Sequence, residues 1–347
     1  GHKKKFLFLF TYIGILSTTC LALVQEGQWQ LAAFIYVIAN VGFAGATSFY
    51  DSLLPSVASP TEIDRLSAIG YGYGYLGGGL LFAINVMMFQ KPELFGIANS
   101  VLAIQYSFLS VGAWWALFSI PLFLWVKEPQ SSHGSKNIFL NTQNGLKEFV
   151  QTVKSLRQLK TLAFFLLAFF LYNDGVGTTI RMAVDYGVSI GFQPSDLILA
   201  LLLVQFVGFP CAIVFGKIAE RTHPKKAIYG AIAMYVFITL WATQISETWE
   251  FYVLAILIGL VQGGIQALSR SYYSRFIPMA KSGEFYGFYN LLGKFTGLIG
   301  PAMVGIVALI FNNTRVGLGS IMILFIAGAL VLSRVDEKKG AAELASL

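Results

Sequence analysis

Long apolar windows recur along almost the whole chain, and they constrain its fold more than any other feature. Each window is close to the roughly 20 residues that an α-helix needs to cross about 30 Å of hydrocarbon. The apolar runs are continuous and show no ten-residue alternation, which favours helices over a transmembrane barrel. We therefore predict an all-α membrane protein with ten spanning helices. The windows lie near residues 6–24, 29–50, 68–90, 103–126, 161–190, 197–216, 227–245, 249–269, 285–310 and 316–333.

The composition agrees with a lipid environment. Of the 347 residues, 56% are apolar and 12% are charged, whereas soluble domains contain about 25% charged residues. The formal charge of +7 does not indicate nucleic-acid binding, because the basic residues are distributed among short connections. The two cysteines form no metal or disulfide pattern, and the three histidines fall in polar connections. We expect no nucleic-acid partner, no metal site and no cofactor.

The positions of the basic residues predict an orientation. Of the 24 Lys and Arg residues, 20 fall on one side of the predicted spans. They include Arg270 and Arg275, which we interpret as membrane anchors, with contact to a departing carboxylate or phosphate as the alternative. Only Lys91 and Arg315 fall on the other side. The positive-inside rule then places both ends of this chain in the cytoplasm.

The longest connection, residues 127–160, divides the spans into four before it and six after it. Its apolar residues at helical spacing predict an amphipathic helix on the cytoplasmic membrane surface. The pattern Tyr50-Asp-Ser-Leu-Leu-Pro55 resembles Tyr273-Ser-Arg-Phe-Ile-Pro278, six spans later. Parallel six-span repeats build the major facilitator transporters. The predicted domains are an incomplete N-terminal bundle (1–126), a linker (127–160), a six-helix C-terminal bundle (161–335) and a cytoplasmic tail (336–347).

A four-span first bundle indicates that two spans are missing from the front of this sequence. The absence of an initiator Met and the abrupt opening GHKKK agree with a fragment. The alternative, that residues 1–24 form a secretory signal, is opposed by the same missing Met and by the charge distribution.

A short motif between two spans, Gly216-Lys-Ile-Ala-Glu220-Arg221-Thr-His-Pro-Lys225-Lys226, resembles the major facilitator loop signature. That signature has a Gly, three residues, an acid, a base and then a basic pair. In that family the acid and the bases latch neighbouring helices on the cytoplasmic side. The resemblance implies this gating role here for Gly216, Glu220, Arg221, Lys225 and Lys226.

Three longer stretches are more specific: ANVGFAGATSFYDSLLPSVASP, LYNDGVGTTIRMAVDYG and GGIQALSRSYYSRFIPMAKSGEFYGFYNLLGKFTGLIGP. They resemble the Unknown Major Facilitator branch, which includes the fungal autophagy-related vacuolar amino-acid effluxers. The resemblance runs through nearly the whole chain and implies a major facilitator fold of twelve spans in two pseudo-symmetric bundles, with ten of them here. It also implies an amino-acid solute, and either the plasma (inner) membrane of a bacterium or the vacuolar membrane of a fungus.

Asp174 and Lys294 lie deep within predicted spans, at roughly 20 Å and 14 Å from the cytoplasmic surface. A lone charge at such depth costs at least ~2.5–3.5 kcal/mol. Asp174 therefore either pairs with Lys294 across facing helices or is neutral in the membrane. A carboxyl that changes between these states could carry a proton, whereas a static ion pair would only orient two helices. Both interpretations remain open at this point.

Further polar residues within spans complete the candidate site. Arg181 and Asp185, four residues apart, can bridge on one helix face or snorkel outward. Gly175-Val-Gly177 predicts a helix break that exposes backbone groups to a solute. Amide side chains suit a polar or zwitterionic solute, or bonds between helices; they are Asn40, Asn173, Gln205, Gln262, Gln266 and Asn290.

These features favour a secondary active transporter that moves a small polar solute by alternating access, with protons as the coupling partner. The sequence contains no Walker A, HExxH or GxSxG motif, so we expect no enzyme activity and no catalytic residue. The alternative is a non-transporting membrane scaffold or receptor on the same fold, which would not need Asp174 or Lys294.

Overall fold

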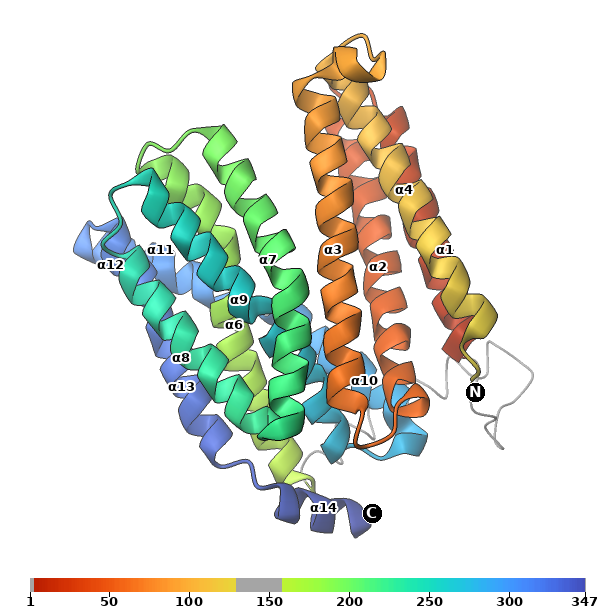
Figure 1. Ribbon diagram of the computed structural model, residues 1–347, viewed down its shortest axis with the longest axis vertical. Coiled ribbons are helices and arrows are strands. Elements are labelled where there is room, and N and C mark those ends of the chain that lie inside the picture. Colours follow the sequence, from red (N-terminus) through yellow and green to blue (C-terminus); the bar gives the residue numbers. More distant parts are fainter. Residues whose placement is uncertain (1–2, 129–157, 347) are drawn as a thin grey trace. The chain divides into compact units, whose positions relative to one another are not determined.

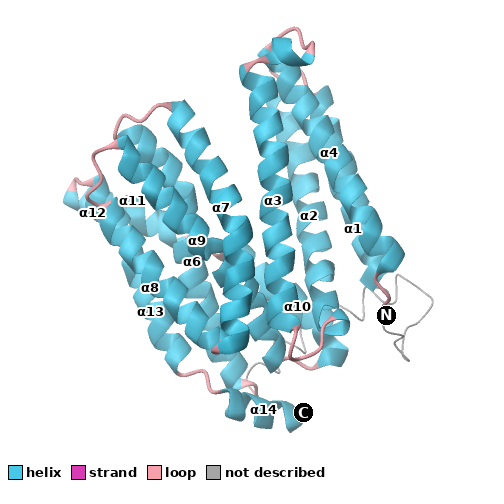
Figure 2. Cartoon of the chain, in the orientation of Figure 1, coloured by secondary structure: helices cyan, strands magenta, loops and turns pink. Residues whose placement is uncertain are grey.

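The computed structural model describes residues 3–128 and 158–346 (Figure 1). Within these ranges the chain forms helices joined by loops, and no strand occurs there (Figure 2). The predicted amphipathic helix of the linker falls in residues 129–157, outside the described residues.

The first part of the chain contains four long helices and two short 3-10 helices. They are α1 (Lys3–Cys20), η1 (Leu21–Leu23), α2 (Trp29–Val57), α3 (Ile63–Gln90), η2 (Pro92–Phe95) and α4 (Ser100–Trp125).

The second part contains four long helices followed by shorter ones. They are α6 (Lys160–Ser189), α7 (Pro194–Arg221), α8 (Pro224–Ala242), α9 (Thr248–Tyr273), η3 (Ser274–Phe276), η4 (Met279–Lys281), α10 (Ser282–Phe295), α11 (Ile299–Phe311), α12 (Thr314–Gly319), α13 (Ile321–Ser333) and α14 (Glu337–Ala345).

Nine helical segments in the described ranges are long and apolar enough to cross a membrane. The 19-residue α8 coincides with the remaining predicted window, 227–245. Large apolar side chains remain exposed on these helices, among them Trp125 at 76% and Leu309 at 84%. Helices that are apolar on their outer surface are expected where lipid is the solvent. The predicted all-helical membrane class is therefore confirmed.

By internal contacts, the chain divides into two compact units. The first lies within Gly1–Val57, Gly77–Leu146 and Ser282–Asn290, and the second within Ala58–Leu76, Lys147–Lys281 and Leu291–Leu347. Two helices are thus shared, because α3 changes unit after Leu76 and α10 changes unit after Asn290.

In the first unit, glycines bring α1 and α2 into backbone contact. A Cβ added to Gly42 would lie 2.5 Å from the backbone nitrogen of Gly14, so no larger residue fits this crossing. The basic start of α1 is fixed to the end of α4, because Lys4 Nζ donates to the carbonyl oxygens of Phe123 and Val126 at 2.9 and 2.6 Å. A cation at a helix C-terminus interacts favourably with the helix dipole.

In the second unit, α6 and α9 are the most enclosed helices. Their core contains a cluster of aromatic rings, in which Phe165 contacts the rings of Tyr272, Tyr273 and Phe276 at centroid distances of 5.4–6.2 Å. α13 packs closely on α6 because Gly328 leaves room for the backbone of Tyr172. This tight packing fixes α6, the helix that carries Asp174.

Candidate functional site

Asp174 lies in the middle of α6 and is fully buried, with a relative exposure of 0%. Its neighbour one turn later, Thr178, is also fully buried and donates to Asp174 Oδ1 at 3.2 Å. An ionised carboxyl in such a place needs several hydrogen-bond donors. Further donors come from a later span, Met279–Phe311, which contains α10 and α11.

The span Met279–Phe311 is interrupted. α10 ends at Phe295 and α11 begins at Ile299, with three residues between them that are not helical. Gly297 in this break has a φ of +97°, a left-handed conformation that glycine adopts without strain. Backbone N–H groups at the start of α11 have no partner within that helix, so they are available to an acceptor.

Asp174 is that acceptor. Its Oδ1 accepts from the backbone nitrogen of Gly297 at 2.6 Å, and both carboxylate oxygens lie 3.2 Å from the nitrogen of Gly300. The start of a helix carries a partial positive charge, which stabilises a carboxylate placed against it. The hydrogen bonds and the partial positive charge at the start of α11 therefore offset the free-energy cost of burying a carboxylate at Asp174.

Two further side chains of α6 donate hydrogen bonds to residues in the break between α10 and α11. Asn173 Nδ2 donates to Thr296 Oγ1 at 2.8 Å, and Arg181 Nη1 donates to the carbonyl oxygen of Gly297 at 2.9 Å. We call these two side chains and Asp174, together with Thr178, which donates to Asp174, the α6 clasp. It consists of Asn173, Asp174, Thr178 and Arg181.

Of the two arrangements left open for Asp174, the structure does not show the pairing with Lys294. The partners of the Asp174 carboxylate in the described ranges are Thr178 and the backbone at 297 and 300, and they do not include Lys294. The side chain of Lys294 is exposed and lies in the last turn of α10, where a cation complements the helix dipole. Asp174 thus binds the backbone within and after the break, whereas Lys294 precedes it.

One other expectation for α6 is wrong, and one of the two alternatives for Arg181 is not realised. The predicted break at Gly175-Val-Gly177 is absent, because α6 is continuous from Lys160 to Ser189. Gly175 instead makes room for the ring of Phe325, which would lie 2.9 Å from an added Cβ. Arg181 binds the Gly297 carbonyl, and Arg181 and Asp185 form no ion pair in the part of the chain that the structure describes.

The predicted amides fall in different places. Gln262 and Gln266 lie together on α9, where Tyr75 of α3 donates to Gln266 Oε1 at 3.2 Å. Gln205 is half-buried on α7. Asn40 is exposed and bonds to a carbonyl of its own helix.

Asn290 belongs to the first unit, where its side-chain nitrogen donates to Asp51 Oδ2 at 3.0 Å. Asp51 is only 3% exposed, and it was not among the predicted site residues. Asp51 lies inside the repeated sequence pattern at 50–55, and this position was the feature of the sequence that could have identified it as a candidate site residue.

In the loop motif, Gly216 packs directly on Ala68 of α3, because a Cβ there would lie 2.5 Å from that side chain. Lys225 Nζ donates to the carbonyl of Val335 at 2.6 Å, and burial lowers the pKa of Lys225, partly offset by Glu337 and Asp336. Glu220, Arg221 and Lys226 are exposed. The latching role of this motif stays a prediction.

The sequence analysis did not predict a network of charged side chains near the basic ends of the helices. Arg275 lies 2.7 Å from Asp64, which is 4% exposed, and 3.6 Å from Glu337. Glu337 is in turn 3.0 Å from His223 Nε2. This network joins α3, η3, α14 and the residue before α8.

Arg270 is buried as well, at 4% exposure, and is not a surface anchor. Its guanidinium donates to Ser67 Oγ and to the Ser67 carbonyl at 3.0 and 3.1 Å, and it lies 4.7 Å from the ring centre of Tyr71. Positions 64, 67, 71 and 75 of α3 therefore form one polar face against α9 and η3. Their spacing of three and four residues was the signal for it.

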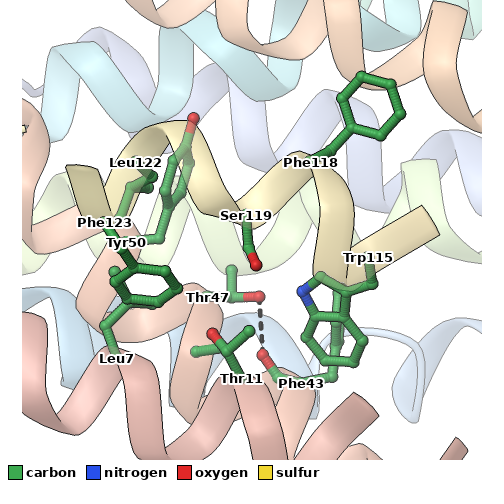
Figure 3. Close-up of a pocket in the computed structure, with 11 residues that line it drawn as sticks. Leu7, Thr11, Phe43, Thr47, Tyr50, Trp115, Phe118, Ser119, Leu122 and Phe123 are labelled. Carbon is green, nitrogen blue, oxygen red and sulfur yellow. Dashed lines mark hydrogen bonds between the residues drawn. The ribbon is translucent and has the colours of Figure 1, made fainter. Parts of the chain in front are cut away.

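A cavity of about 240 Å³ lies in the first unit, between α1, α2 and α4 (Figure 3). Aromatic rings of Phe43, Trp115 and Phe118 line it. Two of its hydroxyl groups bond within their own helices: Thr47 donates to the Phe43 carbonyl at 2.8 Å and Ser119 to the Ala116 carbonyl at 2.9 Å. The predicted site residues do not line this cavity. Its lining suits an apolar group better than the expected polar solute.

The family model described as "Vacuole effluxer Atg22 like" matches residues 1–345 of this chain. The chain belongs to this Atg22-like family. A Bacillus subtilis (strain 168) relative, the "Uncharacterized MFS-type transporter YxiO", is 37% identical over 339 residues, covering 97% of this chain and 78% of the relative. Autophagy-related protein 22 of Yarrowia lipolytica (strain CLIB 122 / E 150) is 24% identical, covering 98% of this chain and 72% of the relative.

Solved structures confirm the major facilitator fold of this Atg22-like chain. The proton:xylose symporter XylE has a TM-score of 0.71 at 16% identity, covering 99% of this chain and 83% of XylE. FucP in the outward conformation has a TM-score of 0.69 at 12% identity, covering 96% of this chain and 82% of FucP. At such identities the likeness concerns the fold alone. With its apolar helices and its relatives, the chain is a multi-pass membrane protein of an MFS-type transporter family.

Proposed function

We propose that this Atg22-like protein is a secondary active transporter that moves a small polar solute by alternating access, coupled to protons through Asp174. The observation that carries the proposal is the α6 clasp. A buried carboxylate holds the interruption between α10 and α11, and interrupted helices are a recurrent device at transporter binding sites.

Proton coupling follows from what protonation does to the clasp. The ionised carboxylate accepts from Gly297 and Gly300 at the positive end of α11. A proton on Asp174 removes the charge and converts an accepting oxygen into a donor. Hydrogen bonds to a charged group contribute about 1.5–3 kcal/mol each, against about 1 kcal/mol for neutral ones. Protonation therefore loosens the start of α11 relative to α6.

Side chains on α6 and α9 support a zwitterionic solute of the amino-acid class. Arg181 uses one guanidinium nitrogen for Gly297 and is otherwise exposed. A guanidinium has five N–H donors and binds carboxylates well. The amide oxygens of Gln262 and Gln266 can accept from an ammonium group. The resemblance to amino-acid effluxers supports the same solute class. The distribution of Lys and Arg supports an orientation with both ends of this chain in the cytoplasm.

A non-transporting scaffold is the competing function. It is favoured by the complete burial of Asp174, since a fully bonded carboxylate can serve to fix α6 to α11 and nothing more. A proton-coupled transporter requires the hydrogen bonds between Asp174 and the start of α11 to break during its cycle, whereas a scaffold does not.

Reconstituted full-length protein distinguishes them. We expect proteoliposomes loaded with an amino-acid panel to show counterflow, and an imposed pH gradient to drive accumulation. Asp174→Asn keeps the shape but cannot take up a proton, so we expect counterflow to persist and gradient-driven accumulation to disappear. Glu93→Gln, at an exposed carboxylate in η2, is the matched control. Accumulation that survives Asp174→Asn would refute the coupling role, and wild-type protein without counterflow would favour the scaffold.

A further inference from the structure

A groove of about 550 Å³ in the second unit lies between α7 and α8, with α9 at its floor. Along α7 and its C-cap its lining extends from Cys211 to Thr222, a distance of 11 residue steps, or roughly 16 Å at 1.5 Å per residue. Half of a hydrocarbon core of about 30 Å is about 15 Å. The groove therefore has the length of a single membrane leaflet.

The groove is apolar along its length and polar at one end. Its deep part is lined by side chains such as Val214, Met234 and Val261, whereas Thr222 and Lys226 line the end nearest the loop between α7 and α8. The charge distribution of the spans predicts that this end is at the cytoplasmic surface. A polar end at the membrane surface above an apolar slot matches the two parts of a phospholipid.

The two lysines of the loop motif have different surroundings. Lys225 gives its Nζ to the Val335 carbonyl at 2.6 Å. Lys226 lines the groove, is exposed, and has no hydrogen bond or ion pair within the described ranges. The last two turns of α7 add the exposed cations Lys217 and Arg221 against one exposed acid, Glu220. The mouth of the groove is therefore basic.

The width of the groove decides between a lipid chain and a protein helix. About 550 Å³ over roughly 16 Å gives a mean cross-section of about 34 Å². An α-helix with side chains is about 10–12 Å across, which corresponds to roughly 80–110 Å². A whole helix of a partner or of a second copy is therefore too wide to enter the groove, whereas a single hydrocarbon chain can lie inside it.

We propose that this groove binds an anionic phospholipid of the cytoplasmic leaflet, with one acyl chain between α7 and α8 and the phosphate at Lys226 and Thr222. Val214 and Ile218, which line it, are 49% and 41% exposed, so the groove opens outward from the unit. Gly230 keeps it open, because a Cβ added there meets nothing within 4 Å. The proposal does not depend on the transport function.

Photo-crosslinking tests the proposal in vesicles of the full-length protein. The probes are phosphatidylglycerol and phosphatidylcholine that carry the same acyl-chain diazirine, and mass spectrometry maps the labelled peptides. We expect phosphatidylglycerol to label residues 211–234. Lys226→Gln should lower that labelling roughly five-fold, the effect of one cation near an anionic headgroup, and should leave phosphatidylcholine labelling unchanged.

The matched pair Gly230→Leu and Gly305→Leu tests the acyl-chain part. Both glycines lie within helices and have open space at Cβ, so leucine is accommodated and favours the helix at each position. We expect Gly230→Leu to abolish labelling of residues 211–234 and Gly305→Leu to leave it unchanged. Groove labelling that survives Gly230→Leu, equal labelling by both lipids, or crosslinks between two copies of the chain at this groove would each overturn the proposal.

Discussion

Replacing Gly300 by alanine perturbs the α6 clasp without changing any charge. A Cβ at this position would overlap Thr178 Oγ1 and lie 3.0 Å from Asp174 Oδ1. Either the start of α11 moves away from α6 or Thr178 is displaced. In both cases the hydrogen bonds between Asp174 and the backbone of α11 weaken.

The size of the expected destabilisation follows from two unfavourable effects and one favourable effect. Overpacking a tight site costs about 1–3 kcal/mol. A weakened hydrogen bond to a charged acceptor loses part of about 1.5–3 kcal/mol. The better helix propensity of alanine offsets up to about 1 kcal/mol. We expect a net loss of about 1–3 kcal/mol for the clasped arrangement, which lowers its population relative to open forms roughly five-fold to a hundred-fold.

The assay combines thermal unfolding of purified protein with uptake driven by a pH gradient. Gly300→Ala should lower both the unfolding temperature and the uptake rate. Gly305→Ala, on the same helix but with open space at Cβ, should change neither. Adding Thr178→Ala to Gly300→Ala removes the overlapping hydroxyl, so we expect a coupling free energy of about 1 kcal/mol in the double-mutant cycle. If Gly300→Ala behaves like Gly305→Ala in both measurements, the clasp is not tight and our reasoning fails.

Two further predictions concern the basic ends of the helices. Arg275→Ala leaves the buried Asp64 carboxylate without its partner at 2.7 Å, so we expect about 3 kcal/mol of destabilisation and a lower unfolding temperature; an unchanged temperature would contradict the ion pair. Glu343→Ala removes the carboxylate that accepts from the backbone and the hydroxyl of Thr161 at 2.9 and 3.1 Å. Because this contact caps the start of α6, its loss should cost about 1 kcal/mol and speed amide hydrogen exchange at Thr161, while exchange at Asp174 stays slow.

The sequence was sufficient to predict the helical spans and the position of Asp174 in the middle of one of them, because hydrophobicity and helical rise are local properties. It was not sufficient to identify the partners of Asp174. Gly297 is 123 residues away in the chain, and residues at equal depth can lie on different faces of their helices. Lys294 was also predicted to lie deep in its span, but its side chain is exposed on α10.

The buried charges on the second unit escaped prediction for a different reason. A basic residue at the end of a span is already explained by the positive-inside rule, so Arg270 and Arg275 carried no further signal by themselves. Their burial depends on α3, which presents Asp64 and Ser67 on the face that meets them. Such contacts become visible only when the helices are placed side by side.

The interruption at residues 296–298 has a consequence for how the protein is made. Two helices of 14 and 13 residues share one span, so two helix ends with unbonded backbone groups meet inside the bilayer. Each such group left without a partner in hydrocarbon costs several kcal/mol. The span therefore cannot settle as an isolated inserted segment. During synthesis α6 emerges first, and we expect it to serve as the template on which this later segment completes its insertion.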